Sequence, residues 1–225
     1  MESNMARRKP GSARIRVPAL VLGALLAVGR LQGQSPAPPV DPAKLPAHDD
    51  HQGLLVAADP YLTAARSEEQ FGKKNPYGAG LLAVDVYIRN NSESPITVNL
   101  STVALEVRPP DERRQKIEAL SVEEAAERIV FPSPVNPTIT RVPRPPSHAA
   151  VRKNKDVTKL AAALAPRALG DIVGPHEMIH GFLFFDVAHQ FDWIATSSLY
   201  LPDVSRINPE EKLLFFDVEL GPATK

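Results

Sequence analysis

The chain has 225 residues, with 26 basic and 26 acidic side chains and no cysteine. The lack of cysteine excludes a disulfide scaffold, a thiolate metal site and a cysteine nucleophile. Residues 1–33 hold six basic residues and one acidic residue, so the remainder of the chain is net acidic. Because nucleic-acid binding needs a basic surface, we predict no nucleic-acid partner.

Residues 1–33 have the pattern of a signal peptide. Five basic residues between positions 7 and 16 precede an uncharged apolar run at 17–28. This run has the length typical of a secretory signal and is shorter than the ~20 residues of a membrane-spanning helix. We therefore predict an extracytoplasmic protein, periplasmic or secreted, that contacts the membrane only through this segment if the segment stays uncleaved.

Residues 34–51 are dense in proline and lack apolar periodicity. Such a sequence favours the extended polyproline II conformation and acts as a spacer. We predict a Pro-rich linker over 34–51, followed by one folded domain over residues 52–222.

The first part of this domain has the alternation typical of β-strands. A short apolar run at 53–58 predicts a first strand, and residues 63–70 predict a short helix that Gly72 ends. Along 80–89 two sets of side chains alternate: the apolar Leu82, Val84, Val86 and Ile88 on one face, and Asp85, Tyr87 and Arg89 on the other. Residues 96–107 alternate again, and the polar turn between the two runs predicts a β-hairpin.

Residues 108–175 are expected to form an insertion with two short helices. One helix is predicted at 121–130, where Ser121 and Glu124 are spaced as a capping box, and the other at 156–165. The prolines of 131–147 exclude a central strand. The basic stretch 131–159 is interpreted either as a solvated loop or as a docking surface for an acidic partner.

The last part returns to strands, which we predict at 177–187, 195–201 and 212–220. The sequence Leu-Phe-Phe-Asp-Val occurs at 183–187 and again at 214–218. In a strand the leucine, the second phenylalanine and the valine share one face. We therefore expect both copies to present these residues to one core and to lie in one sheet.

His176-Glu177-Met178-Ile179-His180 matches H-E-x-x-H, the signature of zinc proteases. On a helix its two histidines share a face and bind one zinc ion, and the glutamate acts as general base. Pro175 disfavours a helix here, and in a strand the two histidines lie ~13 Å apart. A third ligand is not evident, since Glu210 and Glu211 lie in a turn-like context. We therefore expect two exposed histidines on a strand and assign no catalytic, cofactor-binding or metal residues.

Two further parts of the sequence carry residues with a possible role at a site. Asp186, His189 and Asp192 fall where a strand ends, which predicts a solvated turn. Trp193 is expected at the core or its edge, because large aromatic side chains dominate burial in small β domains. Trp193 and Tyr87 are the aromatic platforms available if the domain binds carbohydrate.

The run Gly80–Asn90 with its polar turn, and the runs 181–186 and 213–220, resemble immunoglobulin-like β-sandwich domains of exported bacterial proteins of unknown function. The resemblance implies a mainly β, antiparallel immunoglobulin-like sandwich and brings no catalytic residues. We favour a non-catalytic module for binding or envelope assembly over an enzyme, with a protein or cell-envelope component as partner. Its contact surface is expected at 131–159 or at an exposed strand edge. The alternative is a small zinc-dependent hydrolase using the motif at 176–180.

Overall fold

The computed structural model describes residues 40–108, 113–132 and 155–221. All of these residues belong to one unit, Ser35–Lys225. The predicted signal peptide, residues 1–33, and most of the basic stretch 131–159 lie outside the described residues. The predictions made for those two segments therefore remain predictions.

The described strands form three antiparallel sheets of four strands each. Sheet A has the order β1 (His48–His51), β2 (Leu54–Pro60), β3 (Leu81–Asn90) and β8 (Met178–Asp186). Sheet B has the order β11 (Glu211–Lys212), β10 (Val204–Arg206), β4 (Ile96–Val98) and β7 (Ile172–Val173). Sheet C has the order β12 (Phe216–Glu219), β9 (Ser198–Leu201), β5 (Ala104–Val107) and β6 (Gln115–Glu118). The predicted mainly β, antiparallel class is confirmed.

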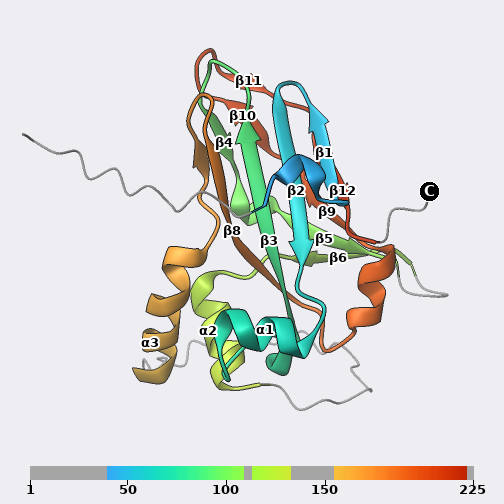
Figure 1. Cartoon of the computed structure of the whole chain (residues 1–225), viewed down its shortest axis with the longest axis vertical. Coiled ribbons are helices and arrows are strands. Elements are labelled where there is room, and N and C mark those ends of the chain that lie inside the picture. The colour runs from blue at the N-terminus through green and yellow to red at the C-terminus, as the bar shows by residue number, and fades with distance from the viewer. Residues whose placement is uncertain (1–39, 109–112, 133–154, 222–225) are drawn as a thin grey trace, which may run out of the picture. The chain divides into compact units, whose positions relative to one another are not determined.

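Three α-helices accompany the sheets: α1 (Ala64–Phe71), α2 (Val122–Val130) and α3 (Lys155–Leu164). Short 3₁₀ helices are η1 (Pro42–Lys44), η2 (Tyr77–Ala79), η3 (Leu100–Thr102), η4 (Ala165–Arg167) and η5 (Phe191–Thr196). Figure 1 shows α1, α2 and α3 gathered at one end of the strands. The predicted capping box is present at α2, where Ser121 Oγ accepts the Glu124 N–H at 3.2 Å and the Glu124 carboxylate accepts the Ser121 N–H at 2.9 Å.

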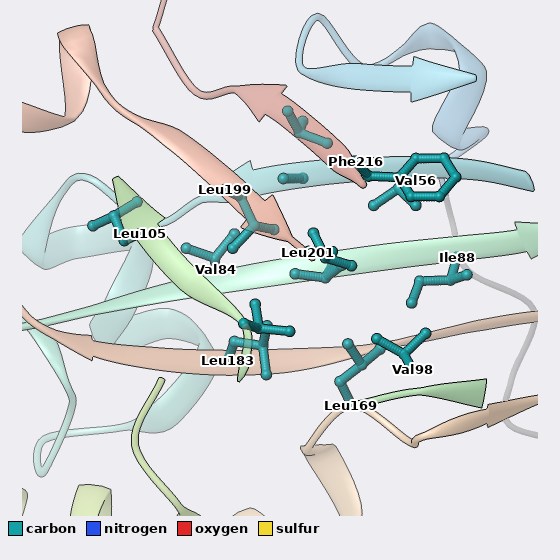
Figure 2. Packing of buried hydrophobic residues seen from close by; sticks show 14 of the residues in the cluster. Val56, Val84, Ile88, Val98, Leu105, Leu169, Leu183, Leu199, Leu201 and Phe216 are labelled. Carbon is teal, nitrogen blue, oxygen red and sulfur yellow. The ribbon is translucent and has the colours of Figure 1, made fainter. Parts of the chain in front are cut away.

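One apolar core receives side chains from all three sheets. Figure 2 shows part of this packing, with Val84 and Ile88 of β3 among residues of sheets B and C. The four apolar side chains predicted to share a face of β3 are all fully buried there. Burial of each such side chain stabilises the fold by about 1.5–3 kcal/mol, so this face determines how β3 is oriented.

The opposite face of sheet A is largely buried as well. Phe182 and Phe184 of β8 pack in a second apolar cluster with residues of α2 and α3. Asp85 and Tyr87, which the alternation places on the polar face of β3, are also buried. A carboxyl group and a phenol are therefore enclosed on the outer side of sheet A.

The predicted hairpin between 80–89 and 96–107 is wrong. Strand β3 pairs with β2 and β8, whereas the second run divides into β4 in sheet B and β5 in sheet C, with η3 between them. The buried Asn90 amide donates to the carbonyl of Ser94 at 2.8 Å and to that of Gly174 at 3.0 Å, and so holds the chain where it leaves sheet A. Alternation determines which side chains share a face, but it does not identify the neighbouring strand.

Two predicted boundaries also need correction. Strand β1 lies within the expected linker 34–51 and pairs with β2 along its whole length, and Pro42 and Ala47 are buried. The sequence of β1, His-Asp-Asp-His, has no apolar alternation from which a strand could be predicted. The expected insertion 108–175 likewise belongs to the sheets, because it supplies β6 to sheet C and β7 to sheet B.

The two copies of the Leu-Phe-Phe-Asp-Val repeat lie in different sheets, the first in sheet A and the second in sheet C. The first copy presents its leucine, second phenylalanine and valine to the core, as predicted. In the second copy Phe216 and Val218 do the same, but Leu214 is exposed because β12 begins only at Phe216. Part of this apolar repeat therefore faces solvent.

Candidate functional site

The H-E-x-x-H motif begins in a turn and runs into a strand, and it forms no helix. Strand β8 begins at Met178, and His176 precedes it with a φ of 53°. His176 Nε2 is 3.0 Å from a Glu93 carboxylate oxygen, whereas His180 Nδ1 is 3.2 Å from Asp85. The two imidazoles thus have different partners, and among the described residues no group of three or more histidine, aspartate or glutamate side chains could hold a metal ion.

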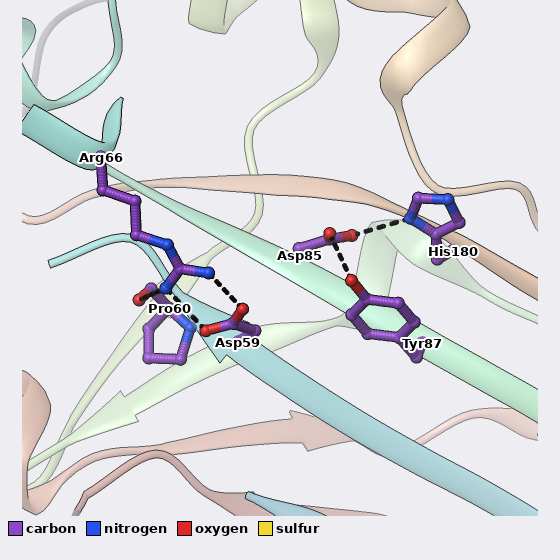
Figure 3. Close-up of polar contacts among 6 residues, drawn as sticks. All are labelled: Asp59, Pro60, Arg66, Asp85, Tyr87 and His180. Carbon is purple, nitrogen blue, oxygen red and sulfur yellow. Dashed lines mark hydrogen bonds and ion pairs between the residues drawn. The ribbon is translucent and has the colours of Figure 1, made fainter. Parts of the chain in front are cut away.

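His180 belongs to a polar group on the outer face of sheet A, which we call the Asp85 cluster: Asp85, Tyr87 and His180 (Figure 3). His180 of β8 lies directly opposite Tyr87 of β3. The Tyr87 hydroxyl donates to Asp85 Oδ2 at 2.9 Å, and His180 Nδ1 lies 3.2 Å from Asp85 Oδ1. The imidazole stacks on the Tyr87 ring, with centroids 5.2 Å apart and planes within 9°. One carboxyl group therefore fixes the orientation of both rings.

A second carboxylate lies beside the Asp85 cluster. Asp59 of β2 is directly opposite Asp85 in the strand register. Arg66 of α1 donates from both terminal nitrogens to Asp59, and its guanidinium lies 4.0 Å from the centre of the Tyr61 ring. Because like charges opposite one another destabilise a sheet, this two-pronged ion pair offsets the repulsion between the neighbouring aspartates.

Burial shifts the protonation equilibria of the Asp85 cluster. Desolvation raises the pKa of the Asp85 carboxyl, while hydrogen bonds from Tyr87 and His180 act in the opposite direction. Desolvation also raises the pKa of the Tyr87 hydroxyl, and the nearby charge of Asp85 adds to this effect. Tyr87 therefore remains a protonated donor at neutral pH. Ionisation of the Asp85 carboxyl costs more free energy in the fold than it does in water.

The geometry of the Asp85 cluster presents an oriented imidazole at a partly exposed position. Within the described part of the chain, the contact with Asp85 is the one hydrogen bond that the His180 side chain makes. An aspartate–histidine pair works in nucleophilic catalysis only when the histidine also reaches a hydroxyl or thiol nucleophile. The nearby Tyr87 hydroxyl is already donated to Asp85. Within the described residues, His180 is thus an oriented, partly exposed imidazole that makes no hydrogen bond to a hydroxyl or thiol nucleophile.

A second candidate surface lies beside β12, and we call it the Phe215 patch: Tyr200, Leu214 and Phe215. Leu214 is 60% exposed and Phe215 is 52% exposed. The Tyr200 ring of β9 lies 5.5 Å from the Phe215 ring, and Lys116 Nζ lies 5.9 Å from the Tyr200 ring centre. The rings of Tyr200 and Phe215 therefore meet at the surface of sheet C, and the exposed Leu214 precedes Phe215 in the chain.

The backbone beneath the Phe215 patch is held by β1 and the residue that follows it. The Leu214 N–H donates to Gln52 Oε1 at 2.8 Å, and the Phe215 carbonyl oxygen lies 3.2 Å from His51 Nε2. The next residue, Phe216, is fully buried and meets the His51 ring edge-on at 4.0 Å. The exposed side chains are therefore presented from a fixed backbone, which reduces the ordering cost of binding.

The other residues that the sequence singled out contact the core or form local hydrogen bonds and ion pairs. Trp193 packs, partly buried, against the main core, as expected. Tyr87 is too buried to serve as a carbohydrate platform. Asp186, expected in a solvated turn, accepts the Ala188 N–H at 3.1 Å and lies 3.1 Å from Arg128.

The sequence pattern placed Asp85 and Tyr87 on one strand face and His180 in the H-E-x-x-H motif, but it did not bring the three together or mark Asp85 as a site residue. Asp85 and Tyr87 share a strand face at a spacing of two, which the alternation shows, but His180 is 95 residues from Asp85. The missing information was the pairing of β3 with β8. The Phe215 patch was missed because the repeat predicted an inward-facing Leu214.

Comparisons with known proteins identify no family for this chain. No protein-family model matches it, and no curated protein matches it. Among solved structures it is similar to a functionally unknown protein from Listeria monocytogenes EGD-e, with a TM-score of 0.30 and 14% identity over 69% of this chain and 70% of that chain. Likeness at this level carries no argument about fold or function. No helix in the described residues is long and apolar enough to cross a membrane.

Proposed function

We propose that the protein is an exported, non-catalytic module of immunoglobulin-like β-sandwich architecture that binds a protein or cell-envelope component. The observation that carries the proposal is the Phe215 patch, where the exposed Phe215 lies against the Tyr200 ring and the exposed Leu214 precedes it on a fixed backbone. Gathered apolar side chains on a surface mark interaction sites, whereas singly scattered ones do not. Aromatic side chains also supply much of the binding energy at protein interfaces.

The architecture and location in this proposal have separate support. Three antiparallel sheets that share one core are compatible with a sandwich. The basic and apolar pattern of residues 1–33 supports export, and the net acidic remainder disfavours a nucleic-acid partner. Contact with the membrane would be made through residues 1–33 if they stay uncleaved.

The zinc hydrolase alternative is less well supported than the binding module. It required a helix at 176–180, but the motif continues into β8, and His180 contacts Asp85 rather than sharing a face with His176. Because the zinc protease motif holds its metal with two histidines on one helix face, the binding module is the better supported function.

Affinity capture from the envelope fraction of the source organism tests the proposal. The bait is the full chain, as wild type, as the double variant Leu214→Ser/Phe215→Ser, and as the control Ile172→Ser, which changes a 57% exposed residue on β7. We expect at least one component to be captured by the wild type and the control but reduced by about tenfold or more with the double variant, as loss of an interface hot spot implies. If all three baits recover the same components in the same amounts, the Phe215 patch is not the binding surface. Circular dichroism of each bait verifies folding.

A further inference from the structure

A cavity of about 440 Å³ opens on the outer face of sheet C. Its polar lining includes Glu106, Arg108, Thr196, Ser198, Asp217 and Glu219. Its volume lies within the range of small-ligand sites, about 300–1,000 Å³. The cavity is separate from the Asp85 cluster, which lies on sheet A.

Strand register places three of the lining side chains in one row. Glu219 of β12 lies opposite Ser198 of β9, and Ser198 lies opposite Glu106 of β5. The next residue of β9, Leu199, is in the core, so Ser198 points to the outer face. The Ser198 hydroxyl is therefore flanked by a carboxylate-bearing residue on each side.

The Ser198 hydroxyl has an unmet hydrogen-bonding capacity. Ser198 is only 8% exposed, and within the described residues its hydroxyl has no hydrogen-bond partner. The adjacent Ser197 hydroxyl, by contrast, donates to the Ile194 carbonyl at 2.9 Å. Because Ser198 lines the cavity and its hydroxyl has no partner among the described residues, this hydroxyl can accept a hydrogen bond from a group inside the cavity.

The charges around the cavity favour a cationic ligand. Glu106 is paired with Arg114 at 2.7 Å, but the carboxylates of Asp217 and Glu219 make no hydrogen bond or ion pair within the part of the chain that the structure describes. Arg108 is the one basic residue in the lining, so free carboxylates outnumber it. A metal ion fits poorly, since the described residues hold no suitable group of three ligands.

We propose that this cavity binds a primary ammonium group. An ammonium has three N–H donors, which match the carboxylates of Asp217 and Glu219 and the oxygen of Ser198. Such a group occurs in a free aliphatic amine and in the lysine side chain of a partner protein. The cavity is not lined by Leu214 or Phe215, so the ammonium site can be tested independently of the proposed function.

An NMR titration of the ¹⁵N-labelled full chain tests the site. The probes are 1,5-diaminopentane, Nα-acetyl-lysine amide and the uncharged 1,5-pentanediol. We expect saturable changes at residues 196–198 and 217–219 with at least one amine and none with the diol. Tighter binding of the lysine amide would indicate a protein source of the ammonium, and tighter binding of the diamine a free amine.

Variants distinguish the site from general attraction of cations to an acidic protein. We expect Glu219→Gln and Ser198→Ala each to weaken amine binding, Glu219→Gln by about tenfold because it removes a charge-assisted hydrogen bond. Glu118→Gln, on the exposed surface of β6 and outside the cavity lining, is the matched control and is expected to bind as the wild type does. Absence of saturable changes with both amines, equal changes with the diol, or equal binding by Glu219→Gln and wild type would overturn the proposal.

Discussion

Removing one hydroxyl from the Asp85 cluster is expected to destabilise the whole domain. Tyr87→Phe deletes the donor that lies 2.9 Å from Asp85 Oδ2 and changes no other contact of the ring. Tyr87 is 4% exposed and the Asp85 side chain 8% exposed, so water does not replace the lost hydrogen bond readily. A hydrogen bond to a charged group contributes about 1.5–3 kcal/mol, and we expect a loss of that size at neutral pH.

Urea unfolding of the full chain measures this loss, with Trp193 fluorescence and circular dichroism as two probes. The variant should show a lower midpoint with an unchanged slope, since the unfolded surface is the same. Tyr200→Phe is the control, because the Tyr200 side chain is partly exposed and its hydroxyl makes no hydrogen bond within the described residues. If Tyr87→Phe is within about 0.5 kcal/mol of wild type, as ordinary surface substitutions are, the reasoning about the Asp85 cluster is wrong.

The pH dependence of the same series tests the state of Asp85. Its pKa is raised in the folded state, mainly by desolvation, so the folded chain binds this proton more tightly than the unfolded chain does. The contribution of this proton to stability is fully present below the unfolded pKa and is lost as pH rises through the raised folded pKa. Asp85→Asn has no such proton, so the free energy of unfolding of this variant, relative to wild type, should rise over that range. A pH-independent difference, or a fall, would refute the assignment.

Three further predictions concern other parts of the chain. Gly181→Ala should destabilise the domain by about 1–3 kcal/mol, because a Cβ there would lie 2.5 Å from the backbone nitrogen of Leu169. Urea unfolding measures this loss, and an unchanged free energy of unfolding would contradict the close approach. Ser121→Ala should cost about 1 kcal/mol by removing the capping hydroxyl of α2, with Ser101→Ala, in η3, as a comparison that loses no helix cap. Zinc analysis of the full chain and of His180→Ala should find no stoichiometric zinc in either, whereas about one zinc per chain lost in the variant would restore the hydrolase.

Local patterns predicted the strands that are buried by apolar side chains at a spacing of two. The β3 face of Leu82, Val84, Val86 and Ile88 is buried as expected, and α2 has the capping box that its sequence predicts. These features depend on residues close together in the chain, so the sequence displays them directly.

Pairing between distant strands could not be predicted in the same way. The run 96–107 was predicted to form one strand, but its alternation is broken by the polar pair Ser101-Thr102, and η3 divides the run there between two sheets. Alternation also leaves the partner strand open. The polar strand β1 is held by hydrogen bonds to β2 rather than by its own apolar face. The Asp85 cluster could not be predicted for the same reason, because His180 reaches Asp85 only through the pairing of the distant strands β8 and β3.

The Phe215 patch can be tested directly by photo-cross-linking in the native host. A photoreactive phenylalanine analogue would replace Phe215 in the full chain, and in a parallel strain it would replace Ile172, which is exposed on β7. The proposed function predicts a discrete cross-linked protein or envelope component from position 215 and none of the same mass from position 172. No adduct at position 215, or the same adduct from both positions, would contradict the proposal that this patch is the binding surface.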